Sequence, residues 1–511
     1  MLNLEQQVGQ RLMAGFDGLA APDYILEWLA AGRIGGIILF QRNVESPEQL
    51  AALTASLHGA AMRPILIAID QEGGEVARLR RLFAEAPSAM ALAAGGGRYA
   101  EAVAHTLGAE MRALGINQNY APVVDVVYNA ANPTVGTRSP GADIQTVARI
   151  AAAQVKGYQD SGVAATAKHF PGLGDTAIDT HVALATINAP LETIEADLLP
   201  YRTVIEAGLA AVMTTHTVFA ALDARLPATL SPVIVPRLLR EHLGYEGVVT
   251  TDCMEMKAIA SHHEPEVSAV LAAQADVDII LFSHTREAQE RAYYGLLAAA
   301  QDGRVSAESM AKALTRIEAM KARYAVTERP DPGSIRSAEH LGLMVEAARA
   351  GTQQVHARPG VLPITADKTV ALIEFASLHD SEVFDATGHT SFAGKFAARR
   401  PDAQVIALPQ APSDDELQQA MAASRAADVT IMATRSAHLN PSQLYAAQLV
   451  LDAAQTTVLL ALRNPFDAGV LPEVDAAVVT FGGAEPQLDA AVGALLGDFI
   501  PTGVSPVELG T

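Results

Sequence analysis

The chain has 511 residues, of which 50% are hydrophobic and 18% are charged, and its formal net charge is −21. This composition is typical of a folded globular protein, and its acidic balance argues against nucleic acid or an anionic membrane as a partner. Since one hydrophobic core stops growing at roughly 250–300 residues, the length predicts two domains.

The first residues lack the basic stretch and apolar run of a secretory signal, and the sequence has no run of about 18 apolar residues that would predict a membrane span. The single cysteine, Cys253, excludes an intrachain disulfide and a zinc site built from cysteines. We therefore expect a cytoplasmic protein that is a monomer or a homodimer, with no membrane partner.

The first two-thirds of the chain alternates short apolar runs with longer amphipathic stretches, such as 147–160 and 191–207. Continuous apolar runs separated by helices are typical of parallel strands covered on both faces. Seven runs have this character: 34–40, 65–70, 117–124, 164–169, 211–216, 247–252 and 277–282. This number of units predicts a (β/α)8 barrel of the TIM type, with a doubly wound open sheet as the alternative.

The ends of these runs favour the barrel over the open sheet. Four of them end in side chains capable of chemistry, at Asp70, His169, His216 and Asp252. In a barrel the carboxyl ends of all strands meet at one site, whereas in an open sheet only those beside the switch point do.

The segment 326–337 contains two prolines, a glycine and several charges, which is typical of a linker. A helical stretch over 338–350 follows it. The alternation then resumes with five apolar runs, at 369–375, 404–408, 428–433, 457–462 and 476–480. We therefore expect a barrel domain over 1–330, a linker and connecting helix over 331–358, and a smaller α/β/α sandwich of flavodoxin-like type over 359–511.

The densest polar cluster follows the fourth apolar run and reads KHFPGLGDTAIDTH over 168–181. Its glycines allow the backbone to approach a ligand closely. Asp179 and His181 are two residues apart, so a bent loop can bring their side chains together. A carboxylate beside an imidazole orients the ring for proton transfer, and we predict that this pair is a general acid/base. The alternative is a surface loop rich in polar turn residues.

Asp252 ends the apolar run 247–252. An ionised carboxylate at that place can act as a nucleophile, but aspartate is also a preferred helix N-cap, and the run alone leaves both open. Asp70 is either a ligand for hydroxyl groups or the opening residue of a turn. Arg138, in a loop bounded by proline and glycine, is either a ligand contact or a surface arginine. Cys253 is expected to be a buried packing residue.

Together these residues resemble glycoside hydrolase family 3, in its β-N-acetylglucosaminidase branch. The resemblance rests on Lys-His-Phe-Pro-Gly, Gly-Asp-Thr and Asp-x-His between 168 and 181, on Asp-Gln-Glu-Gly-Gly at 70–74, on the loop with Arg138 and Ser139, and on Asp252 with Met256. It covers residues 1–330. Around 461–465 the second domain is similar to the appended domain of two-domain members.

The resemblance implies a retaining β-N-acetylglucosaminidase without metal or cofactor, with Asp252 as nucleophile, His181 as acid/base and Asp179 as the partner of His181. The residues it implies for substrate binding are Asp70, Arg78, Arg138, Lys168 and His169, with His216 in a supporting role. Leu173 and Glu75 stand where the family commonly has histidine and arginine, which leaves the preference for the aglycone open.

Other functions remain open at this stage. An imidazole acid leaves less negative charge near an incoming anion than a carboxylate does, so a phosphorylase of the same family is one alternative, and a β-glucosidase is another. Outside the family, the alternatives are a sugar-binding protein without catalysis, an aldolase with Lys168 as Schiff-base former, and a metal-dependent barrel hydrolase. The last would draw its ligands from His169, Asp175, Asp179, His181, His216 and Asp252.

Overall fold

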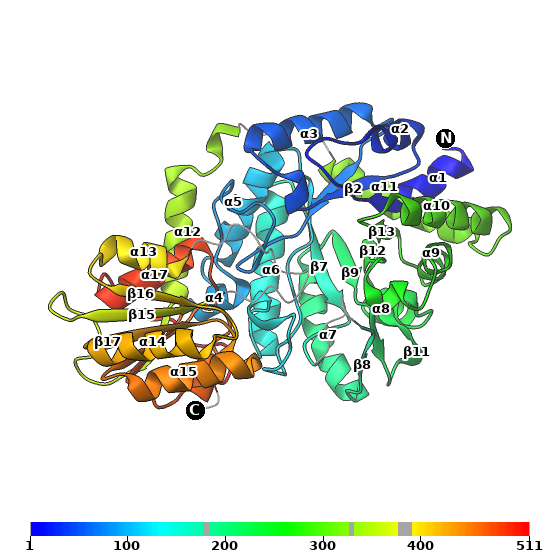
Figure 1. Ribbon diagram of the computed structural model, residues 1–511. Coiled ribbons are helices and arrows are strands. Elements are labelled where there is room, and N and C mark those ends of the chain that lie inside the picture. Colours follow the sequence, from blue (N-terminus) through cyan, green and yellow to red (C-terminus); the bar gives the residue numbers. More distant parts are fainter. Residues whose placement is uncertain (1, 177–182, 326–331, 377–390, 510–511) are drawn as a thin grey trace.

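The computed structural model describes residues 2–176, 183–325, 332–376 and 391–509, which form two domains lying side by side (Figure 1). The first domain is a closed barrel of eight parallel strands that follow one another around the barrel in chain order. This confirms the predicted TIM-type barrel. The strands are β1 (Leu12–Ala14), β2 (Gly36–Leu39), β3 (Leu66–Ile69), β6 (Gln118–Asn119), β7 (Ala164–Phe170), β9 (Ala211–Thr214), β12 (Val248–Cys253) and β13 (Ile279–Phe282).

Two of these strands differ from the sequence prediction. Strand β1 was not predicted, because only three residues form it directly behind a helix, yet it closes the barrel by pairing with both β2 and β13. The apolar run 117–124 is a strand only at Gln118–Asn119. Pro122 has no N–H to donate to a ladder, and after it a single bridge joins Val123 to Lys168.

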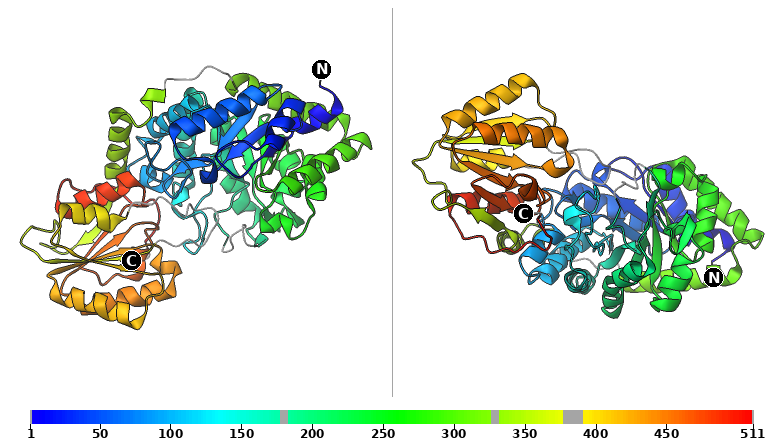
Figure 2. Two further views of the ribbon diagram at one scale, coloured as in Figure 1. Left: turned by 45° about the horizontal axis from the view of Figure 1, so that its top comes forward. Right: turned by 90° about the horizontal axis from the view of Figure 1, so that it is seen from below.

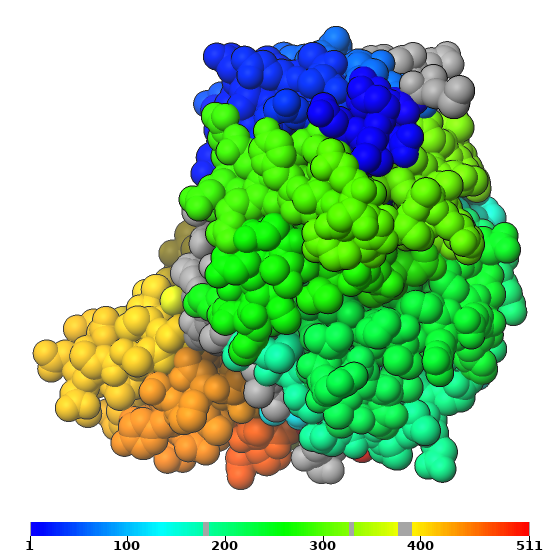
Figure 3. All heavy atoms as spheres, turned by 90° about the vertical axis from the view of Figure 1, so that its right-hand side faces the viewer, coloured from blue at the N-terminus to red at the C-terminus, as the bar shows by residue number. Residues whose placement is uncertain are grey.

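Helices surround the barrel and connect its strands. In Figure 3 the N-terminal residues, in dark blue, lie against green residues of the same domain, and the contacts of α1 with α10 and α11 agree with this view. No helix in the described ranges is both long enough and apolar enough to cross a bilayer. The helices are α1 (Leu4–Gln10), α2 (Asp23–Ala31), α3 (Pro47–Ala60), α4 (Ala89–Ala94), α5 (Ala100–Ala113), α6 (Ile144–Asp160), α7 (Leu191–Glu206), α8 (Lys257–Ala260), α9 (Pro265–Gln274), α10 (Arg286–Gln301), α11 (Ala307–Tyr324) and the π-helix Ile234–His242.

Short strands extend the chain beyond the carboxyl ends of the barrel strands. Strands β4 (Gln71–Gly73) and β5 (Val76–Ala77) form an antiparallel hairpin directly after β3. Strands β8 (Ala185–Ile187), β10 (Thr217–Phe219) and β11 (Asp223–Pro227) form a separate three-stranded sheet after β7 and β9. These additions stand on the side of the barrel where polar strand ends converge.

The second domain is built on a mixed six-stranded sheet with the order β14-β19-β18-β17-β15-β16. Its five parallel strands have the order 2-1-3-4-5 that flavodoxin-like sheets have. Strand β14 was not predicted, because it is a half-exposed edge strand with polar residues, and it runs antiparallel to β19. The strands are β14 (Gln353–Ala357), β15 (Val370–Phe375), β16 (Gln404–Leu408), β17 (Val429–Thr434), β18 (Thr457–Ala461) and β19 (Ala476–Val479).

Helices cover both faces of this sheet, as Figure 2 shows. Because side chains alternate along a strand, Ile431 faces α13 and α17, whereas its neighbour Met432 faces α14 and α15. This is the predicted α/β/α sandwich. Its helices, with the connecting helix first, are α12 (Ala338–Gly351), α13 (Phe392–Arg399), α14 (Asp414–Ala426), α15 (Pro441–Ala453), α16 (Asp467–Val470) and α17 (Glu485–Leu496).

The two domains share an apolar core. Met90, Val127 and Leu173 of the barrel domain belong to the same buried cluster as Phe466 and Phe481 of the second domain. The connecting helix α12 also packs against both α4 and α17. The second domain is therefore joined to the barrel by packing as well as by the chain.

Candidate active site

A pocket of about 390 Å³ lies at the carboxyl ends of the barrel strands. Its walls come from the ends of several strands, which is where barrel enzymes place their active sites. Six of the side chains predicted from the sequence line this one pocket: Asp70, Arg78, Arg138, Lys168, His169 and Asp252. The predicted pair Asp179 and His181 lies outside the described residues.

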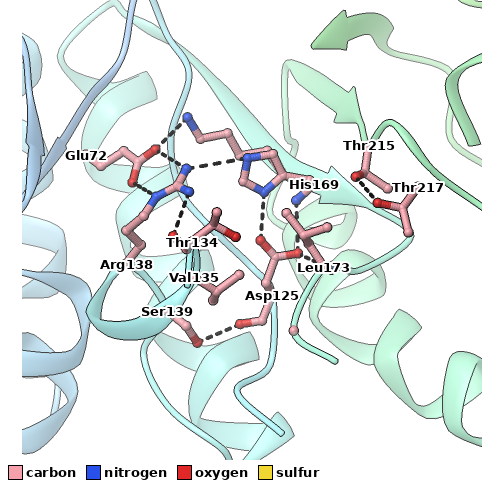
Figure 4. A network of polar contacts seen from close by, with 12 residues as sticks. Glu72, Asp125, Thr134, Val135, Arg138, Ser139, His169, Leu173, Thr215 and Thr217 are labelled. Atoms are coloured by element: carbon pink, nitrogen blue, oxygen red, sulfur yellow. Dashed lines mark hydrogen bonds and ion pairs between the residues drawn. The ribbon is translucent and has the colours of Figure 1, made fainter. Parts of the chain in front are cut away.

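Four of the lining residues form a buried ionic network. The Lys168 Nζ atom lies 2.6 Å from Asp70 Oδ1 and 2.6 Å from Glu72 Oε1. Arg138 donates from Nε and Nη2 to the two oxygens of Glu72, at 2.8 Å each (Figure 4). A bidentate pair of this kind fixes the positions of both side chains.

The opposite charges in this network favour the ionised form of each partner. Burial alone would raise the pKa of Glu72, but the Arg138 guanidinium and the Lys168 ammonium outweigh it and hold that pKa well below its usual range. Burial likewise lowers the pKa of Arg138, and the Glu72 carboxylate raises it by more. The wall of the pocket therefore carries ionised groups in a fixed arrangement, suited to a ligand with several hydroxyl groups.

His169 is held from behind by a residue that the sequence reasoning did not single out. The His169 Nδ1 atom lies 2.7 Å from Asp125 Oδ2, and Asp125 Oδ1 accepts from the amides of His169 and Leu173 at 3.2 and 2.7 Å (Figure 4). Asp125 is 1% exposed. The signal was its place between valines at 123–124 and 126–127, since a buried charge requires partners.

The other ring nitrogen of His169 faces the pocket side. A carboxylate oxygen beside Nδ1 favours the tautomer with the proton on Nδ1, which leaves the lone pair on Nε2. Arg138 Nη2 lies 3.4 Å from that atom, in position to donate to it. Asp125 therefore determines which nitrogen of His169 accepts hydrogen bonds.

Asp252 lies within β12 and is partly exposed to the pocket. Its Oδ1 accepts from the amide of Cys253 at 2.7 Å. The next helix, α8, begins only at Lys257 with Met256 at the N-cap, so Asp252 is not a helix cap. A carboxylate on a strand in the pocket wall is positioned to react with a bound ligand.

Cys253 is a packing residue, as predicted. Burial raises the pKa of its thiol to about 12. Its Sγ atom lies 2.8 Å from Ser283 Oγ. A thiol that stays protonated is a poor nucleophile, which excludes Cys253 from that role near neutral pH.

His216 is not among the described residues that line the pocket, although it was grouped with the substrate-binding residues. It is 1% exposed, and its ring nitrogens lie 2.8 Å from Thr229 Oγ1 and 2.9 Å from the carbonyl oxygen of Cys253. It therefore supports the main chain beside Asp252. The sequence placed it at a strand end but contained no sign of the direction of its ring.

Three further charged residues missed by the sequence reasoning line the pocket: Glu72, Arg42 and Glu255. Glu72 lies between Asp70 and Gly74 in the motif 70–74. This sequence context does not distinguish a pocket residue from a residue of a turn. The described part of the chain contains no group of three or more His, Cys, Asp or Glu side chains placed to share a metal ion.

Comparisons with known proteins show which family and which proteins this chain is similar to. A model of the glycosyl hydrolase family 3 N-terminal domain matches residues 3–320. The beta-hexosaminidase A of Pseudoalteromonas piscicida is 34% identical over 411 residues, which cover 71% of this chain and 69% of that protein. The matched part of this chain is thus longer than the barrel domain alone.

Two solved structures are also similar. A glycoside hydrolase family 3 beta-N-acetylglucosaminidase from Paenibacillus sp. is 35% identical with a TM-score of 0.94, and the match covers 100% of this chain and 99% of that one. A beta-N-acetylhexosaminidase from Beutenbergia cavernae is 35% identical with a TM-score of 0.59, over 63% of this chain and 99% of its own. The first of these has both domains in common with this chain.

Proposed function

The protein belongs to glycosyl hydrolase family 3, and from this membership we propose that it removes terminal β-linked N-acetylglucosamine with net retention of configuration. The proposal is supported by the similarity to relatives described as beta-hexosaminidases and beta-N-acetylglucosaminidases. The observation that carries the chemistry is that Asp252 lines the same pocket as Asp70, Arg138, Lys168 and His169.

In the first step of the proposed reaction, a carboxylate oxygen of Asp252 attacks the anomeric carbon of the sugar. The glycosidic C–O bond breaks, and His181 protonates the departing oxygen. Asp179 holds the imidazole ring for this transfer. The sugar is then joined to Asp252 by an ester bond, and the aglycone leaves as an alcohol.

In the second step a water molecule attacks the same carbon from the side that the aglycone left. The neutral imidazole of His181 takes a proton from the water, and the bond to Asp252 breaks. Two inversions at one carbon give retention. The free sugar leaves, and both side chains return to their starting state.

The ionic network supplies binding in this scheme. Asp70 and Lys168 present charged atoms to hydroxyl groups of the sugar, and Glu72 and Arg138 keep those atoms in place. Charge-assisted hydrogen bonds are stronger than neutral ones, and the network is buried from bulk water. The wall is therefore already arranged before the substrate arrives.

The test is a panel of nitrophenyl β-glycosides, assayed with and without phosphate. We expect cleavage of the N-acetylglucosaminide to free sugar at a rate independent of phosphate. Faster cleavage of the glucoside would refute the proposed substrate, and release of the sugar as its 1-phosphate would make the protein a phosphorylase.

The Asp252→Asn variant tests the nucleophile. An amide cannot form the ester intermediate, so we expect kcat to fall by about 10⁴-fold or more. The control is Glu308→Gln, which changes an exposed carboxylate on α11 and should leave kcat unchanged. A kcat of Asp252→Asn within tenfold of the wild type would contradict the assignment.

A further inference from the structure

The hairpin of β4 and β5 carries Glu72 into the pocket, and Arg78 follows directly after it. The turn of the hairpin is Gly74-Glu75. Arg80 Nη2 donates to the carbonyl oxygens of Gly74 and Glu75, at 2.7 and 2.8 Å. The turn is thus held from the barrel side by a buried guanidinium, and a shift of the turn would displace Glu72.

The same turn is also held from the second domain. Glu75 is 4% exposed, and its Oε1 accepts from the amide of Gly483 at 3.2 Å. A second barrel carboxylate, Glu85, accepts from the amide of Glu485 at 3.1 Å through Oε2. Further along, Ser88 Oγ donates to the carbonyl oxygen of Phe481 at 2.5 Å.

The two carboxylates lie at the amino end of α17, where Glu85 accepts from the first amide of the helix and Glu75 accepts from the amide just before the N-cap residue. The first amides of a helix have no partners within it, and a side chain at the N-cap usually supplies one. The N-cap here is Ala484, which has no polar side chain. Carboxylates are favoured at this end by the helix dipole, and those of Glu75 and Glu85 come from the other domain.

In the second domain, the backbone at Gly483 is closely packed against a buried side chain. A Cβ atom on Gly483 would lie 2.8 Å from Arg435 Nη1, so the backbone passes close to that guanidinium. Arg435 is 4% exposed and is ion-paired with Glu374 at 3.3 Å. The amide that faces Glu75 therefore has little freedom to move.

The second domain also contacts the segment that carries Arg138, the ion-pair partner of Glu72. Arg138 belongs to the loop 132–138, and a Cβ atom on Gly136 of this loop would lie 2.5 Å from Asn464 Oδ1. Asn464 is a buried residue of the second domain. Both members of the pair Glu72–Arg138 thus lie on segments that the second domain contacts.

We propose that the second domain holds the substrate-binding hairpin in position, and that Glu75 is a positioning residue that acts on the sugar through Glu72. The inference rests on the proposed function of the pocket. It also gives a reason for the glutamate at 75, since an arginine would present a cation to the amino end of α17.

The experiment compares Glu75→Ala with Glu75→Gln. The alanine removes the acceptor for the Gly483 amide, so we expect KM to rise about tenfold while kcat changes much less, because the reacting groups remain in place. The glutamine keeps an Oε1 acceptor, and we expect its KM within about threefold of the wild type. The substrate is whichever nitrophenyl glycoside the wild type cleaves fastest.

The matched control is Ile431→Ala, which opens a cavity in the core of the second domain between β17, α13 and α17. It should lower Tm and leave KM unchanged. If Glu75→Ala lowers Tm alone, or if Ile431→Ala raises KM equally, the positioning role is refuted. Should Glu75→Ala fail to fold, Ser88→Ala removes a neighbouring contact with the second domain, the hydrogen bond to the Phe481 carbonyl, together with the N-cap of α4, and should raise KM in the same direction.

Failure of the proposed function gives a different result. In that case the wild type cleaves another glycoside, and the comparison of the Glu75 variants is made with that substrate. Direct binding of N-acetylglucosamine, measured by titration calorimetry, separates the two ideas further. Weaker binding to Glu75→Ala than to Glu75→Gln supports the positioning role independently of turnover.

Discussion

Replacing Asp125 with asparagine changes one hydrogen bond in the candidate active site and leaves its neighbours in place. The side-chain oxygen of asparagine can still accept from the amides of His169 and Leu173, as Asp125 Oδ1 does. The side-chain NH2 group then faces His169 Nδ1, where the carboxylate oxygen lay 2.7 Å away. Two donors cannot share that contact, so the imidazole proton moves to Nε2.

The consequence is felt on the pocket side of His169. With a proton on Nε2, the ring faces the Arg138 guanidinium donor to donor, across a separation of 3.4 Å. The variant thus loses the charge-assisted hydrogen bond between Asp125 and His169 and the acceptor that faced Arg138, a loss of about 1.5–3 kcal/mol. This corresponds to a fall in kcat/KM of about 10- to 150-fold.

Two measurements check this reasoning. Steady-state kinetics with the nitrophenyl glycoside gives kcat/KM, and ¹⁵N NMR of labelled histidine reports which ring nitrogen carries the proton. Asp125→Ala is the companion variant, because it also removes the acceptor for two buried amides and should lower Tm strongly. A kcat/KM of Asp125→Asn within twofold of the wild type, or an Nδ1 that remains protonated, would refute the argument.

Glu72→Gln removes the charge that Arg138 and Lys168 share, and should lower kcat/KM by about 10- to 100-fold, mainly through KM; unchanged steady-state constants would contradict a binding role for the network. Burial lowers the pKa of Lys321 to about 7, below the value of about 10 in an unfolded chain. The unfolded state therefore binds more protons between these values, and this residue makes stability rise with pH from about 7 to about 10. Lys321→Met should remove that contribution, which urea unfolding at both pH values would show; an identical pH dependence in both proteins would refute it.

The sequence predicted the strands that are long and apolar and missed those that are short or polar. Strand β1 is three residues long, and β14 is a polar edge strand, so neither produces the hydrophobic run on which the prediction depended. Each of these two segments is a strand because it pairs with neighbouring strands. The pairings of β1 that close the barrel and the antiparallel edge of the second sheet could be seen only in three dimensions.

The residues of the candidate site likewise divide into those that could be predicted from the sequence and those that could not. Asp70, His169 and Asp252 could be predicted to line one site, because each ends an apolar run and strand ends converge in a barrel. Asp125 acts through His169, which is 44 residues away, and Glu75 meets Gly483 across 408 residues. Partners at such separations leave no trace in the local pattern of the chain.

The apolar core that both domains share has a consequence for how this protein could have been assembled in evolution. Cutting the chain after the barrel would expose Met90, Val127 and Leu173 to water and would leave Glu75 and Glu85 without the helix end that receives them. Such a surface favours aggregation. Gain or loss of the second domain therefore requires a coordinated change of the barrel surface.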